Sequence, residues 1–98
     1  MNGKLTKDHQ KSLLETLKDP KEAAAYLNAA LEEGDNELFL LAMKNVVKAS
    51  GVSNIARKTN LNRENLYKML SEKGNPEFSS LWAILDSVGL KMFIDTAS

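Results

Sequence analysis

The stretch that decides the fold is Val52–Ser71, which reads V-S-N-I-A-R-K-T-N-L-N-R-E-N-L-Y-K-M-L-S. It has the residue pattern of a helix-turn-helix, in which two short helices cross and the second can lie in a DNA major groove. Ala56 stands where the two helices press together and only a small side chain fits. Asn60 falls in the turn, where one residue takes a left-handed backbone conformation that Gly and Asn tolerate. The positions expected to face inward are Ile55, Leu61, Leu66 and Met69.

The outward side chains of this motif are the candidate contacts with DNA. Arg63 could hold a guanine edge through two hydrogen bonds, and Asn62 or Asn65 could do the same for adenine. Tyr67 offers a hydroxyl for a phosphate and a ring for a thymine methyl group. The other candidates would contact phosphates, which position a protein without reading sequence: Ser53, Asn54, Arg57, Lys68 and Lys73.

Each of these residues also has a plainer interpretation. The outward side chains could be ordinary solvated helix residues, and Ser53 could simply cap the first helix of the motif. Glu64 could accept from a cytosine amino group, but an ion pair with Arg63 or Lys68 is the expected role.

The charge of the chain is zero in total but is unevenly distributed along it. Residues 1–43 carry five Lys/Arg against eight Asp/Glu, residues 44–73 carry seven against two, and residues 74–98 carry one against three. The segment around the motif therefore has a net charge of +5, which suits phosphate binding. The acidic N-terminal part would suit a basic partner, although charge blocks of this size also arise by chance.

Composition excludes several other classes of protein. Ninety-eight residues make one domain, without a cysteine for a disulfide or a thiolate zinc site. The single His9 has no nucleophilic or metal-binding neighbours in sequence, so we expect no enzyme, metal or cofactor. No run approaches the roughly 18 apolar residues of a membrane span, and the N-terminus lacks the apolar segment of a signal peptide. The expected compartment is the cytoplasm.

Signals for helix starts and ends divide the rest of the chain. Residues 1–18 form a separate segment, either a marginal helix from about Thr6 to Leu17 or a mobile arm. Asp19 and Pro20 begin a second helix that faces inward through Ala23, Leu27, Ala30 and Leu31, and Gly34 ends it. Asp35 caps a third helix over 36–49 that is apolar nearly all round and therefore central.

The C-terminal part is predicted to hold one more helix and a strand. Asn75-Pro76 starts the helix, Gly89 ends it, and its core-facing stripe is Phe78, Leu81, Trp82, Leu85 and Val88. After Gly89 the apolar period changes to two, which is typical of a strand. A single strand is not stable alone, so we expect it to pair with the same strand of a second copy, through Leu90, Met92, Phe93 and Ile94.

Several runs in this order resemble one known family. They are D-P-K-E-A-A-A-Y-L-N-A-A-L-E-E-G-D, L-F-L-L-A-M-K-N-V-V-K-A-S-G, N-L-Y-K-M-L-S and G-N-P-E-F-S-S-L. Over about residues 19 to 94 the chain resembles the addiction-module antidote family of helix-turn-helix antitoxins, which are lambda-repressor-like and related to HigA. Relatives mostly have Gly where this chain has Asn60, and residues 1–18 lie outside the resemblance.

The resemblance implies a function as well as a fold. It implies a dimeric antitoxin that binds double-stranded operator DNA, represses its own operon and neutralises a RelE/HigB-like toxin. The toxin would meet the acidic N-terminal half, with residues 1–18 folding on contact. A stand-alone phage-type repressor and an interaction module that no longer binds DNA are the alternatives. The predicted fold is all-α, with five or six helices in residues 19–98 and the N-terminal segment, and a C-terminal strand that pairs across a dimer.

Overall fold

A computed structural model of the chain describes residues 6–97, in which six helices and no strand form. They are α1 (Lys7–Thr16), α2 (Pro20–Glu32), α3 (Asn36–Ser50), α4 (Val52–Thr59), α5 (Arg63–Met69) and α6 (Phe78–Ser87). The all-α class is therefore confirmed. None of these helices is long and apolar enough to cross a membrane.

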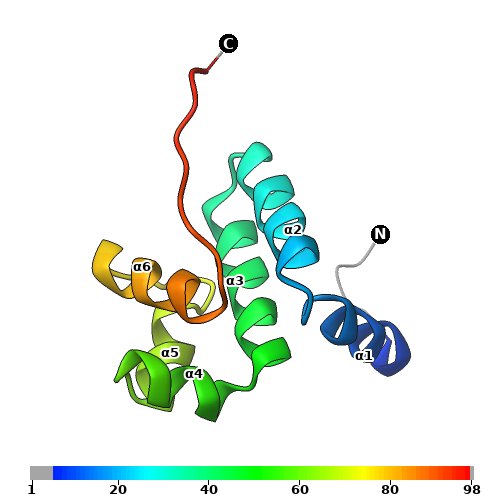
Figure 1. Cartoon of the computed structure of the whole chain (residues 1–98), viewed down its shortest axis with the longest axis vertical. Coiled ribbons are helices and arrows are strands. Elements are labelled where there is room, and N and C mark those ends of the chain that lie inside the picture. The colour runs from blue at the N-terminus through cyan, green and yellow to red at the C-terminus, as the bar shows by residue number, and fades with distance from the viewer. Residues whose placement is uncertain (1–5, 98) are drawn as a thin grey trace.

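Helix α3 is the centre of the fold, as its apolar sequence predicted. Helices α1, α2 and α4 all pack against it, and Figure 1 shows α3 running between the α1–α2 pair and the α4–α6 group. Both Met43 and Val46 are almost completely buried on it. Burial on several sides explains most of the apolar residues of this helix. Leu38 and Leu41 are the exceptions, because both are exposed.

Two of the expected helix caps are confirmed. The side chain of Asp19 accepts a hydrogen bond from the backbone N–H of Lys21, with Pro20 at the first position of α2. The side chain of Asp35 accepts from the N–H groups of Glu37 and Leu38, so it satisfies two otherwise free donors at the start of α3.

Helix α1 is docked on the body of the protein. Leu17, directly after its last turn, is only 3% exposed. The side chain of Gln10 donates to Oδ1 of Asn45 on α3 at 3.5 Å, and Nδ2 of Asn45 donates to the Tyr26 hydroxyl on α2 at 2.9 Å. This polar chain joins three helices, so α1 is held at a defined place on α3.

The predicted start of α6 and the predicted burial of two of its aromatic residues were wrong. Helix α6 begins at Phe78 after Glu77, and not at Pro76. Phe78 and Trp82 were expected in the core, but they are 63% and 56% exposed and form an edge-to-face pair with ring centroids 5.7 Å apart. The helix is buried instead along Leu81, Ile84, Leu85 and Val88. At 100° per residue, Trp82 lies roughly 110° around the helix from the middle of that stripe.

Leu31 was also expected to face inward, but it is 56% exposed. It lies in the last turn of α2, and the buried residues of that helix are Ala23, Leu27 and Ala30. Leu31 instead lines a surface groove with Phe93 and Ile94 of the C-terminal tail.

The tail itself, residues 90–97, has no regular secondary structure in the single chain. It continues from α6 along an extended course that Figure 1 shows leaving the helices in red. Phe93 and Ile94 are 84% and 92% exposed, Met92 is also exposed, and Leu90 is half-buried against the core. The strand predicted here is therefore not formed in the single chain, and its pairing with a second copy stays a prediction.

Candidate nucleic-acid interface

Helices α4 and α5 are joined by the tight turn that the sequence predicted. Asn60 has φ 61° and ψ 27°, and it is the one non-glycine residue with positive φ among residues 6–97. The N–H groups of Asn60 and Leu61 both reach the carbonyl of Ala56, which closes the turn. An Asn side chain is tolerated in this left-handed conformation, so the departure from Gly leaves the turn intact.

The inward side of this helix pair holds both helices on the core. Ile55 and Leu66 are 0% and 1% exposed, whereas Leu61, Met69 and Ala56 are half-buried. Helix α4 packs against α3, α5 and α6. Since Leu66 faces the core, its neighbours on α5 are turned toward the surface.

The start of α5 is fixed by the predicted cap. The Asn62 side chain accepts from the N–H of Asn65 at 2.7 Å. One lone pair of its oxygen is used in this bond, which leaves the second lone pair and both amide N–H groups free for a base.

The start of α4 differs from the prediction. Gly51, with φ 94°, is the N-cap residue, and no side chain caps this helix. Ser53 was predicted to cap it, but Ser53 lies inside the helix with its side chain exposed. Gly51 takes the cap position because the chain must leave α3 through a backbone conformation that disfavours other residues.

The structure places all nine predicted DNA contacts on or beside these two helices. Eight of them are exposed, and Asn54 is half-buried. The Asn54 side chain accepts from Arg57 Nη2 at 2.8 Å, which aims the guanidinium along α4.

Two further arrangements position side chains of α5. The ammonium of Lys44 lies 5.9 Å from the centre of the Tyr67 ring, within the range of a cation–π contact. Asn65, Lys68 and Lys73 line one groove between α5 and the loop that follows it. In that loop, a Cβ on Gly74 would lie 2.1 Å from the carbonyl oxygen of Met69, so only glycine fits there.

The ion pair expected for Glu64 does not form. Between residues 6 and 97 the structure has one ion pair, Lys18 with Glu15. Both Arg63 and Lys68 are therefore left without a carboxylate partner in the described chain. Sequence reasoning missed Lys44, which belongs to α3, because its proximity to Tyr67 depends on how α3 packs beside α5.

The fold and this surface define a class of protein. It is a small all-helical protein that presents the exposed polar face of a short helix, α5, held by a tight turn after α4. The family described as probable addiction module antidote protein matches residues 8–96, so the chain belongs to that family. The match begins 11 residues before the resemblance seen in the sequence and includes nearly all of α1.

A relative supports the same grouping without adding a function. An uncharacterised protein of Haemophilus influenzae is 38% identical over 77 residues, which is 79% of this chain and 79% of that protein. No solved structure matches the chain.

Proposed function

We propose that this protein is the DNA-binding antitoxin of a type II toxin–antitoxin module. In this proposal α4 and α5 are a lambda-repressor-like helix-turn-helix, and α5 enters the major groove of an operator. The protein represses its own operon and, in the cytoplasm, neutralises a RelE/HigB-like toxin by direct binding. The family supplies the antidote role. The DNA-binding role rests on the residues of α5.

One observation carries the DNA-binding role. Leu66 is buried, while Asn62, Arg63, Asn65, Tyr67 and Lys68 are all exposed around it. These residue types read base edges and bind phosphates.

Dimerisation would place two copies of α5 on one operator. Tail residues Phe93 and Ile94 are largely exposed, and Met92 lines a shallow pocket with Trp82. The apolar surface of the tail is therefore continuous with that of α6, and exposed apolar patches mark interaction sites. We propose that Leu90, Met92, Phe93 and Ile94 pair as a strand with a second copy, which sets two α5 helices about 34 Å apart.

The toxin would bind the acidic side of the chain. Asp35, Glu37 and Glu72 line a groove with Leu38 and Leu41, both of which are exposed. Carboxylates around exposed leucines suit a partner with a basic, partly apolar surface.

The DNA-binding role is tested by changing Arg63→Ala and Lys68→Ala together. The affinity for a duplex taken from directly upstream of the coding sequence should fall by roughly 10- to 100-fold at fixed salt, since a lost bidentate base contact costs ~1–3 kcal/mol. The control changes Lys21→Ala, which removes a positive charge away from α4 and α5 and outside the proposed dimer strand. An unchanged affinity for the α5 variant would refute the assignment of α5 as the recognition helix.

The dimer and the toxin are tested separately. Phe93→Ser with Ile94→Ser should give monomers by analytical ultracentrifugation, without unfolding, because both side chains are exposed in the single chain. A dimer that survives would place the interface elsewhere.

Co-expression with the protein of the adjacent gene should yield a stable complex, and its absence would favour a stand-alone repressor.

A further inference from the structure

A large surface groove lies outside the α4–α5 pair, between α1 and the C-terminal half of α3. Its floor is apolar, from Leu13, Leu14 and Leu41. Its rim is basic, from lysines on both helices.

One carboxylate lines the groove, and it is already paired. The ammonium of Lys18 lies 2.6 Å from Oε2 of Glu15. The hydrogen bond from Lys18 and its positive charge hold the pKa of Glu15 below its usual value, so this carboxyl group is ionised at neutral pH. Lys7, Lys11 and Lys48 form no ion pair among residues 6–97, although the charge of Lys11 also helps to lower the pKa of Glu15.

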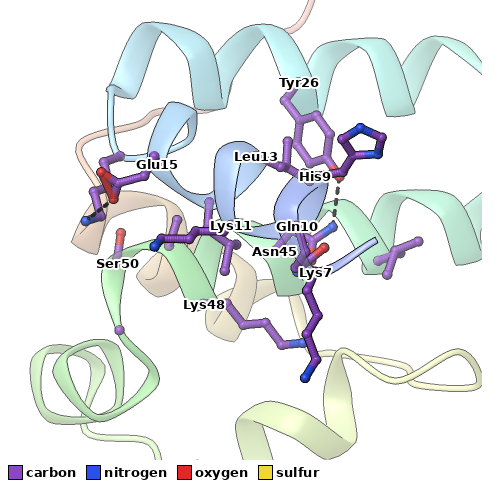
Figure 2. A pocket seen from close by; sticks show the side chains of 15 residues that line it. Lys7, His9, Gln10, Lys11, Leu13, Glu15, Tyr26, Asn45, Lys48 and Ser50 are labelled. Atoms are coloured by element: carbon purple, nitrogen blue, oxygen red, sulfur yellow. Dashed lines mark hydrogen bonds and ion pairs between the residues drawn. The ribbon is translucent and has the colours of Figure 1, made fainter. Parts of the chain in front are cut away.

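The groove also adjoins the proposed DNA-binding surface. Ser50 and Gly51 line it, and Gly51 is the residue from which α4 begins. Figure 2 shows Lys11 extending from α1 toward Ser50, and Lys7 and Lys48 line the same groove. The basic rim therefore lies beside the end of α4 at which Ser53 and Asn54 are expected to meet a phosphate.

These lysines are carried on a fixed element. Lys7 and Lys11 are one turn apart on α1 and share a face. Helix α1 is anchored by buried Leu17 and by Leu13 and Leu14, which are partly buried against the core. Helix α1 is already formed in the single chain, so its lysines can bind at a lower entropic cost than those of a mobile arm.

We propose that α1 is part of the DNA-binding surface, with Lys7 and Lys11 on α1 and Lys48 on α3 contacting the phosphates of DNA that flanks the base pairs read by α5. This inference rests on the proposed function. It gives the N-terminal segment a role in DNA affinity, where the sequence had indicated contact with a toxin. Phosphate contacts of this kind raise affinity for every sequence and carry no base preference.

The test is a double variant, Lys7→Gln with Lys11→Gln, in the full chain. Neither change threatens α1, because a lysine in the first turn opposes the helix dipole and Lys11 is exposed. The control, Lys21→Gln, removes a positive charge on α2, away from the groove and outside the proposed dimer strand. Affinities are measured from 50 to 200 mM salt for the upstream duplex and for a random duplex of equal length.

Loss of two phosphate contacts should lower the salt slope by about 1.8, so wild type should lose roughly tenfold more affinity over this range than the variant. Both duplexes should weaken alike, and the control should match wild type. Wild-type slopes in the α1 variant, or an equal loss in the control, would overturn the role of α1 and leave α5 as the reader of DNA. A wild-type chain that binds neither duplex would instead remove the proposed function itself.

Discussion

The buried amide of Asn45 gives the sharpest test of how the helices are held together. Asn45 is 7% exposed, and it is the one buried polar side chain among residues 6–97. Its Nδ2 donates to the hydroxyl of Tyr26 at 2.9 Å. Changing Tyr26→Phe removes this acceptor and leaves a buried N–H group without a partner, which costs about 1–3 kcal/mol. Because Tyr26 is half-buried and water can reach its edge, we expect a value near 1 kcal/mol, or roughly 4–8 °C in Tm for a domain of this size.

A double-mutant cycle isolates this interaction. Asn45→Leu in the Tyr26→Phe background replaces both polar partners with apolar groups of similar size, so the double variant should be less destabilised than the sum of the single variants. Urea unfolding followed by circular dichroism gives each free energy, with an unchanged slope as the check on two-state behaviour. Gln10→Ala is the matched control, since its 3.5 Å bond to Asn45 is at the limit of hydrogen-bond length. Strictly additive effects, or a Tyr26→Phe variant as stable as wild type, would refute the reasoning.

Three further predictions concern the backbone that positions the site. Asn60→Gly should leave stability nearly unchanged, whereas Asn60→Val should cost about 1–2 kcal/mol by thermal unfolding, because a β-branched residue opposes the left-handed turn; equal stabilities would contradict this. Asp35→Ala should cost ~1 kcal/mol in the same assay, since two N–H groups at the start of α3 lose their acceptor. Gly74→Ala should displace the loop after α5 and cost about 1–3 kcal/mol, and an unperturbed spectrum and Tm would show that the loop has room for a Cβ.

The sequence predicted the helices best where local chemistry determines them. Asp19 and Asp35 at helix starts, Asn62 before α5 and Asn60 in the turn could all be placed because a cap or a left-handed residue depends on its immediate neighbours. Helix α3 could be identified as central because it is apolar around most of its surface. The exposed residues of α5 could also be predicted, because helical periodicity places them outside once Leu66 is placed inside.

The errors arose where tertiary packing decides which face of a helix is buried. Phe78 and Trp82 are the largest apolar residues of α6, so a pattern based on hydrophobicity included them and omitted Ile84, which is fully buried. The choice depends on where α4 crosses α6, which no local signal reports. Ser53 resembled a cap, but Gly51 takes the N-cap position, so α4 begins at Val52, before Ser53.

The net charge of a block of sequence also did not show on which surface its charges lie, again because of packing. Lys7 and Lys11 belong to the N-terminal block with a net charge of −3, and this block was assigned as a whole to an acidic surface. The fold separates its charges: these two lysines line one groove together with Lys48, whereas Asp35 and Glu37 line another. Blocks of sequence are therefore poor guides to the charge of a surface when helices pack across them.

The most direct test of DNA recognition is the affinity of the full wild-type chain for two duplexes as salt is varied. We predict that it binds the duplex from upstream of its own coding sequence at least ~1,000-fold more tightly than a random duplex. The logarithm of each binding constant should fall linearly with the logarithm of salt, by about 0.9 for each phosphate contacted. Equal affinity for both duplexes, or no binding even at 50 mM salt, would contradict the assignment of α4 and α5 as a DNA-reading unit.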